Sequence, residues 1–84
     1  MYFIYILRSE EGKYYIGSTG DVEKRIYQHN SKKYKSWSSR YNNWALIHKE
    51  EFVTRREALI REKEIKGYKG GEAFKRIISS SLGS

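Results

Sequence analysis

Cysteine is absent from this chain of 84 residues. Disulfides, thiolate zinc sites and cysteine nucleophiles are therefore excluded, and any bound metal must take oxygen or imidazole ligands. Long apolar runs are also lacking, because no stretch approaches the ~20 apolar residues that a membrane-spanning helix needs. The N-terminal run YFIYIL is too short for a signal peptide, and charged residues follow it at once. We expect a soluble, cytoplasmic protein that does not enter a membrane.

Acidic residues are scarce relative to basic ones. The chain has 10 Asp and Glu against 17 Lys and Arg, which gives a formal net charge of +7 and a pI near 9.7. Such an excess favours polyanionic partners, because each cation placed near a phosphate releases condensed counterions. Nucleic acid is the first candidate partner, and an anionic membrane surface is the second. Aromatic residues make up 15% of the chain, and some of them can stack on bases.

The residue pattern predicts a domain with the element order β-β-α-β-α-α. The first strand, residues 2–8, carries apolar or aromatic side chains on both faces, so we expect it at the centre of the sheet. A turn at residues 9–12 makes a hairpin with the second strand, residues 13–17, and brings Tyr5 near Tyr15. The remaining elements are a third strand at 44–52 and helices at 21–30, 54–66 and 72–78.

The length of the chain leaves room for one domain with little stability to spare. We expect a single domain over residues 1–78, followed by a flexible C-terminal tail at 79–84. Residues 31–43 are polar and basic, with three aromatic residues spaced through them and no helical or strand periodicity. This segment is predicted to be a loop.

The first helix carries charged or titratable side chains on its apolar face. Asp21 is a good N-cap, since its carboxylate can accept a hydrogen bond from the first turn. The residues that share one face at helical spacing are Val22, Arg25, Ile26 and His29. One interpretation is that Arg25 and His29 lie at the surface, with the Arg25 stem covering apolar neighbours. The other is that they form a site with Tyr15, Gly17 and the polar turn after them.

Two acids of the second helix can be told apart by their positions. Thr54 and Glu57 fit a capping box, in which each side chain satisfies a backbone N–H of the other residue. Glu62 instead shares an apolar stripe with Ala58 and Ile65. Burying a bare carboxylate is costly unless a cation or a hydrogen-bond donor meets it. Glu62 is therefore expected to have a partner, either a divalent ion or Arg25.

Four short motifs follow one another along the chain. They are Phe3-Ile4-Tyr5, Tyr15-Ile16-Gly17, Arg25 with His29, and Glu57-Ala58-Leu59 with Glu62 and the Ile65-Lys66 pair. This set resembles the GIY-YIG nuclease superfamily, and its small stand-alone members closely, from Tyr2 to about Lys66. The first signature departs from the family in having Phe3 where the family has Gly, which removes no functional group.

The resemblance implies a fold and a chemistry. The implied fold is the α+β GIY-YIG fold, a small three-stranded antiparallel sheet flanked by helices. The implied reaction is hydrolysis of a nucleic-acid phosphodiester with one divalent ion, Mg²⁺ or Mn²⁺, held at the position of Glu62. Waters would complete the shell of such a hard cation.

The needs of phosphodiester hydrolysis, which are an activated water and neutralised charge at the phosphate, suggest a role for each of the other site residues. Arg25 would grip the phosphate oxygens. Tyr5 is the candidate general base, although a phenol with a pKa of about 10 must be shifted by nearby cations to act near neutral pH. Tyr15 would assist it or hold the water, and His29 would relay a proton or position Tyr5. The alternatives are that both tyrosines only pack in the strands and that Glu62 only forms an ion pair with Arg25.

Further contacts to nucleic acid are predicted outside these five residues. Gly17 and Ser18 offer a backbone that a substrate can approach closely. The basic loop adds charges with aromatic side chains between them, and its candidate contacts are Lys32, Lys33, Lys35, Trp37 and Arg40. The alternative is that this loop is simply a solvated basic segment. His48 on the third strand is expected to be a hydrogen-bonded strand residue rather than a ligand.

Two classes of function remain open from the sequence. The first is a metal-dependent endonuclease of low sequence specificity, acting on DNA and directed to a DNA structure such as a flap, nick or branch, as in repair or recombination. The second is a nucleic-acid-binding module that keeps the nuclease fold without activity. Low specificity is expected because these residues hold no separate DNA-binding domain. No obligate protein partner is inferred, and binding to a membrane surface is the weakest alternative.

Overall fold

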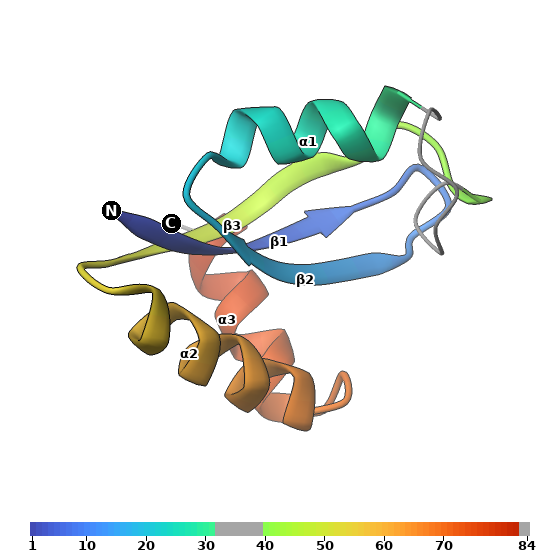
Figure 1. The fold of residues 1–84 in the computed structure, drawn as a ribbon. Coiled ribbons are helices and arrows are strands. Elements are labelled where there is room, and N and C mark those ends of the chain that lie inside the picture. Colours follow the sequence, from blue (N-terminus) through green and yellow to red (C-terminus); the bar gives the residue numbers. More distant parts are fainter. Residues whose placement is uncertain (32–39, 83–84) are drawn as a thin grey trace.

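The computed structural model describes residues 1–31 and 40–82. Within them the chain forms an antiparallel sheet with one helix on one face and two helices on the other (Figure 1). The elements are β1 (Tyr2–Arg8), β2 (Tyr14–Thr19), α1 (Val22–Ser31), β3 (Ala45–Phe52), α2 (Arg55–Gly67) and α3 (Glu72–Leu82). The predicted α+β class, the three antiparallel strands and the order β-β-α-β-α-α are confirmed.

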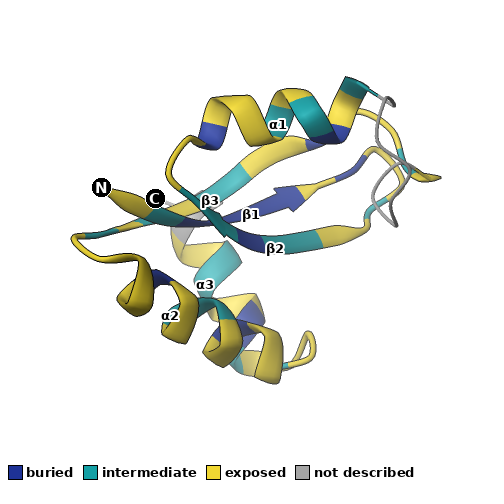
Figure 2. Ribbon diagram, viewed as in Figure 1, coloured by how far each residue is buried: buried dark blue, intermediate teal, exposed yellow. Residues whose placement is uncertain are grey.

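Strand β1 is the centre of the sheet, as its sequence predicts. The strand order is β2-β1-β3, and the four residues from Ile4 to Leu7 are each at most 1% exposed. Ile4 and Ile6 pack in one cluster with α2 and α3, whereas Tyr5 and Leu7 pack in a second cluster with α1 and Trp44. Figure 2 shows this burial running along β1 between the two helical layers. The alternation of side chains along a strand thus places the two phenols of the candidate site on the α1 face.

The β1–β2 hairpin has a register that sets Tyr5 opposite Gly17 and Leu7 opposite Tyr15. Tyr5 and Tyr15 are diagonal neighbours on one face, with ring centroids 6.1 Å apart. The predicted proximity of these tyrosines is confirmed. The predicted end of the second strand at Gly17 is too early, because Ser18 and Thr19 continue the pairing with Ile4 and Phe3.

Helix α1 begins at a side-chain hydrogen bond, and near its end two others join it to Trp44. The Lys24 N–H donates to Asp21 Oδ1 at 3.1 Å, so the predicted N-cap is confirmed. At the other end, the Asn30 amide accepts from the Trp44 N–H at 2.8 Å and donates to the Trp44 carbonyl at 3.1 Å. Val22 and His29 are buried and Arg25 is exposed. The helix therefore presents His29 to the sheet and Arg25 to its rim.

Helix α2 starts at the predicted cap. Thr54 Oγ1 accepts from the Glu57 N–H at 3.3 Å, and its hydroxyl donates to the Glu57 carboxylate at 2.9 Å. Glu57 is therefore engaged in the cap, although through the hydroxyl rather than through the Thr54 backbone. Further along, Ala58 and Ile65 are fully buried. The stripe that contains Glu62 faces the sheet, as the spacing predicts.

Helix α3 runs to Leu82, beyond the predicted end at Ile78. Its apolar side packs on the sheet through Phe74, Ile77 and Ile78. The helix continues because the residues after Ile78 include no Gly or Pro before Gly83, and Ser is only mildly unfavourable in a helix. Residues 79–82 of the predicted tail are thus helical. In the part of the chain that the structure describes, no helix combines the length and apolar character needed to cross a membrane.

Candidate active site

Tyr5 lies directly against Gly17. A Cβ atom added at Gly17 would lie 2.6 Å from Tyr5 Oη, 2.8 Å from Tyr5 Cζ and 3.1 Å from Tyr15 Cε1. No real Cβ could occupy that place without a shift of the ring. Tyr5 is only 1% exposed, so it has little space into which it could move. The glycine of this motif is therefore required by the phenol on the neighbouring strand.

His29 completes an aromatic cluster on the α1 face of the sheet. Tyr5 Oη and His29 Nε2 are within hydrogen-bond distance, at 3.3 Å. The rings of Tyr15 and His29 lie closer together than the two tyrosine rings do, with centroids 4.3 Å apart. The ring of Trp44 lies near both, with its centroid 6.1 Å from that of His29 and 6.3 Å from that of Tyr15. The structure thus brings together the two tyrosines and the histidine that the sequence singled out.

Burial raises the pKa of Tyr5 above its ordinary value, and the charges of Tyr15 and Glu62 add to this effect. Arg25 acts in the opposite direction but does not outweigh them. The general-base role predicted for Tyr5 required the reverse, a pKa lowered by nearby cations. That condition is not met in the free protein, because a phenolate loses more hydration in this buried site than one guanidinium returns.

His29 is the neutral base of the pair, and its surroundings make it a weaker base than a free imidazole. Burial lowers its pKa below the ordinary 6.5, and Arg25 lowers it further. The imidazole is therefore neutral at neutral pH. A neutral imidazole at hydrogen-bond distance from a phenol can take the phenolic proton when the phenol gains another one.

The depressed pKa of His29 predicts acid sensitivity of the fold. The unfolded chain binds this proton more readily than the folded protein, so the contribution to the free energy of unfolding is present above pH 6.5 and is lost as the pH falls below it. We expect urea unfolding to show a larger loss of stability between about pH 7.5 and about pH 5.5 in the parent than in His29→Gln. His48 is present in both proteins, so it does not affect the difference between them. An equal loss in the two proteins would contradict the assignment.

Glu62 lies on α2, across the sheet from these rings. Its side chain is 18% exposed, and its carboxylate forms an ion pair with Lys66 Nζ at 2.7 Å. The suggested ion pair with Arg25 is wrong for the free protein, because Arg25 donates instead to Gln28, at 3.4 Å. The partner is the residue one helical turn away, which the i, i+4 spacing could have indicated. The Glu62 charge still reaches Tyr5, whose pKa it raises.

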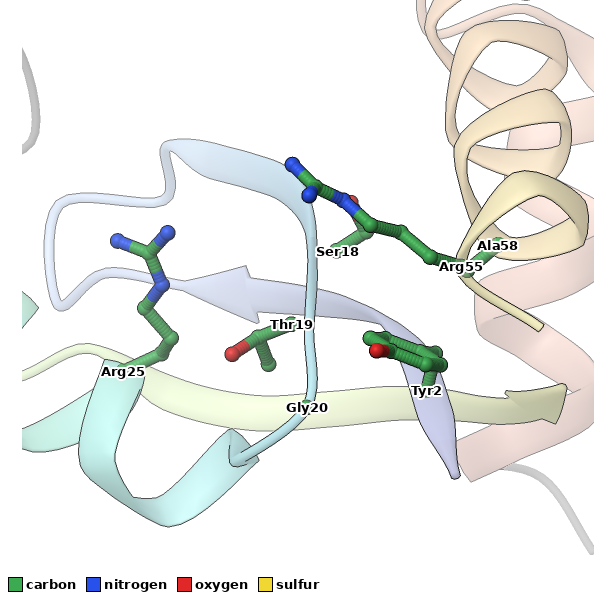
Figure 3. Close-up of a pocket in the computed structure, with 7 residues that line it drawn as sticks. All are labelled: Tyr2, Ser18, Thr19, Gly20, Arg25, Arg55 and Ala58. Carbon is green, nitrogen blue, oxygen red and sulfur yellow. The ribbon is translucent and has the colours of Figure 1, made fainter. Parts of the chain in front are cut away.

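A pocket joins the helices of Arg25 and Glu62 at the end of β2. It has a volume of about 230 Å³ and is lined by Tyr2, Ser18, Thr19, Gly20, Arg25, Arg55 and Ala58. Figure 3 shows Arg25 and Arg55 coming from different helices, with the Ser18–Gly20 segment between them. Ala58 is one turn before Glu62 on the same stripe of α2. Arg25 and α2, on opposite faces of the sheet, therefore meet around its β2 edge.

A divalent ion bound at Glu62 would have one acidic ligand, and this carboxylate does not line the pocket. No group of three or more His, Asp and Glu side chains that could hold a metal gathers among residues 1–31 and 40–82. The Glu62 carboxylate fits a strongly hydrated ion that takes one or two carboxylates, several waters and the substrate phosphate. Lys66 is no obstacle, since its side chain is 54% exposed and such ion pairs contribute little.

The residues predicted to contact nucleic acid differ in where they lie relative to the pocket. Ser18 lines the pocket, whereas Gly17 is buried and does not line it. Arg40 is exposed and lies two positions before Asn42, whose carbonyl accepts from Glu10 at the far end of the sheet. It is thus separated from the pocket. The other loop candidates, Lys32, Lys33, Lys35 and Trp37, lie outside the described residues.

Sequence reasoning missed Arg55 as a pocket residue. Its only local signal is its place directly after the Thr54 cap, which does not indicate that α2 approaches the end of β2. His48, in contrast, behaves as predicted, since its Nε2 lies 2.7 Å from Glu50 Oε2 on the same strand. Arg61 of α2 binds the same carboxylate. This group ties α2 to β3 on the side away from the pocket.

Comparison with known proteins matches residues 1–75 to the family model described as the GIY-YIG catalytic domain. A UPF0213 protein of Staphylococcus saprophyticus is 36% identical over 76 residues, covering 90% of this chain and 93% of that protein. One of Haloquadratum walsbyi is 37% identical over 67 residues, covering 80% of this chain and 75% of that protein.

The fold is also similar to a solved structure. The solution NMR structure of a UPF0213 protein from Bacillus halodurans has a TM-score of 0.56 and 29% identity, and the match covers 100% of this chain and 88% of that one. It has the same small α+β architecture. Together with the family match over residues 1–75, these findings show that the chain belongs to the GIY-YIG catalytic domain family.

Proposed function

We propose that this protein is a divalent-metal-dependent endonuclease that hydrolyses phosphodiester bonds of DNA with low sequence specificity. Membership of the GIY-YIG family supports nuclease activity in general. The observation that carries the fuller proposal is the pocket at the end of β2, where Arg25 of α1 meets the helix that carries Glu62. The net charge of +7 favours a polyanionic substrate.

Residues from both faces of the sheet contribute to neutralising the negative charge of the reacting phosphate. Arg25 binds the non-bridging oxygens, because a guanidinium offers two parallel N–H donors to a phosphate. Glu62 is the residue that would hold the ion, with waters as its other ligands. When bound, Mg²⁺ or Mn²⁺ supplies positive charge to a phosphate oxygen and lowers the pKa of a coordinated water.

Proton transfer is assigned to the buried cluster. Tyr15, which is half-buried, orients the attacking water. Tyr5 accepts the proton of this water as its own hydroxyl proton passes to His29 Nε2 across the 3.3 Å contact. Tyr5 stays neutral throughout, so its raised pKa does not oppose the step. His29 ends with the proton and later returns it to solvent or to the leaving oxygen.

A nucleic-acid-binding module without activity is the second candidate. One observation favours it, which is that Tyr5 is only 1% exposed. Such a module would still bind phosphates through Arg25. It would not cut a strand, because water would not reach the Tyr5 hydroxyl.

A cleavage assay separates these two functions. Plasmid, single-stranded, nicked, flap and branched DNA are incubated with Mg²⁺ or Mn²⁺, beside the matching RNA single strand and an EDTA control. We expect metal-dependent cutting that prefers a DNA structure and is lost in Arg25→Ala. Binding without any cutting of these substrates would leave the module as the function. Cutting at the same rate with EDTA as with Mg²⁺ or Mn²⁺ would show that the reaction needs no divalent metal.

A further inference from the structure

Arg55 shares the pocket at the end of β2 with Arg25. Among the described residues that line this pocket, two are cations and none is a carboxylate. The two guanidinium groups come from α1 and α2, on opposite sides of the Ser18–Gly20 segment (Figure 3). Like charges repel across a shared hollow, and a bound anion relieves that repulsion.

Two cations of α2 are neutralised by acids, whereas Arg55 is not. Arg61 binds Glu50 and Glu64, and Lys66 binds Glu62. Arg55 forms no hydrogen bond or ion pair with any residue that the structure describes, and its side chain is exposed. The charge of Arg55 is therefore available to a ligand.

The hollow continues past Arg25 along α1. A neighbouring depression shares Thr19, Gly20 and Arg25 with the first pocket. Its other lining residues are Asp21, Lys24 and Gln28. Cations therefore follow one another along a track from Lys24 through Arg25 to Arg55. A track of spaced cations fits a chain of phosphates better than it fits one isolated anion.

Arg55 is too far along α2 to serve the phosphate that Glu62 serves. The two residues are two helical turns apart, and at 1.5 Å per residue their backbones are separated by about 10 Å along the axis. They share one stripe of the helix, so both address the same edge of the sheet. A strand that lies along this edge presents a different phosphate to each.

We propose that Arg55 is a positioning residue that binds a backbone phosphate of the substrate strand next to the phosphate held by Arg25. The inference rests on the proposed function only in taking the Arg25 pocket as the place where a polynucleotide lies. The contact is an Arg fork on a phosphodiester. It aligns the strand so that the adjacent ester reaches Arg25 and Glu62, and it takes no part in the chemical step.

The first test measures binding without cleavage. A fluorescent single-stranded DNA oligonucleotide is titrated in EDTA at several salt concentrations. We expect Arg55→Ala to weaken binding roughly tenfold and to reduce the slope of log K against log salt by about 0.7, the value for one contact on a single strand. Arg55→Lys should keep the slope. Arg56→Ala, which removes the same charge from the next residue, should leave the slope unchanged because Arg56 does not line this pocket.

Equal slopes for the parent and Arg55→Ala, or equal losses for Arg55→Ala and Arg56→Ala, would overturn the proposal. The same outcome follows if Arg55→Ala weakens binding to phosphatidylserine vesicles but not to the oligonucleotide, since the site would then serve a membrane surface. If the parent protein binds DNA without cutting it, the proposed nuclease activity is refuted. The salt slopes would still show whether Arg55 contacts a phosphate.

The second test separates the flanking phosphate from the reacting one. Bis(4-nitrophenyl) phosphate has a single phosphate, so Arg55→Ala should cleave it at the parent rate with Mn²⁺, whereas Arg25→Ala should not. On an oligonucleotide, Arg55→Ala should raise KM roughly tenfold with little change in kcat. A matching loss on the single diester would place Arg55 at the reacting phosphate and overturn its assignment to a neighbouring one.

Discussion

Glu62→Gln is expected to lower the rate of DNA cleavage by on the order of 10³-fold, the equivalent of about 4 kcal/mol, with the fold retained. Gln has the size of Glu and can still accept a hydrogen bond from Lys66, but it lacks the charge that holds a divalent ion. The free energy of unfolding should change by less than about 1 kcal/mol, since the lost ion pair has an exposed partner. Initial rates with Mn²⁺ and a calorimetric Mn²⁺ titration measure the two effects separately.

Glu57→Ala is the matched control on the same helix. It should cost about 1 kcal/mol of stability through the Thr54 cap and leave both cleavage and Mn²⁺ binding intact. The opposite pattern, with cleavage lost in folded Glu57→Ala and kept in Glu62→Gln, would mean that the other acid of α2 holds the ion. Retention of Mn²⁺ binding by an inactive Glu62→Gln would give Glu62 a role other than metal ligand.

Local chemistry explains what could be predicted from the sequence. The helix starts follow from Asp21 and Thr54, whose side chains satisfy N–H groups within one turn. The central position of β1 follows from its apolar residues on both faces, and the inward position of His29 follows from its spacing to Val22. Each of these depends on residues a few positions apart. The family motif then adds the expectation that the two tyrosines, Arg25, His29 and Glu62 form one site.

The remaining features depend on contacts between distant segments. The hairpin register, which sets Tyr5 opposite Gly17, is decided by turn geometry and by the packing of both faces together. The depth of Tyr5, and with it the direction of its pKa shift, depends on α1 covering that face. The place of Arg55 depends on α2 crossing to the β2 edge. No local pattern around any of these residues contains that information.

Gly17→Ala is expected to cost about 1–3 kcal/mol of stability, the usual cost of overpacking a core. Its Cβ would fall 2.6 Å from Tyr5 Oη and 2.8 Å from Tyr5 Cζ, so the ring must move away from Gly17 and away from its contact with His29. Displacement of catalytic groups by about 1 Å can cost on the order of 10²-fold in rate. Urea unfolding and initial cleavage rates of the folded protein measure the two losses.

The second half of this experiment asks whether the Tyr5 ring causes the loss of stability. Tyr5→Phe removes Oη, the atom nearest to the added Cβ, and keeps the ring carbon at 2.8 Å. In this background Gly17→Ala should therefore lower the free energy of unfolding measurably less than in the parent. Gly67→Ala is the control, because its Cβ would meet nothing within 4 Å and Ala is favoured over Gly in a helix. An identical cost of Gly17→Ala in both backgrounds would show that backbone conformation, and not the phenol, requires this glycine. A cost no greater than that of Gly67→Ala would show that the β1–β2 pairing can open enough to accept a methyl group.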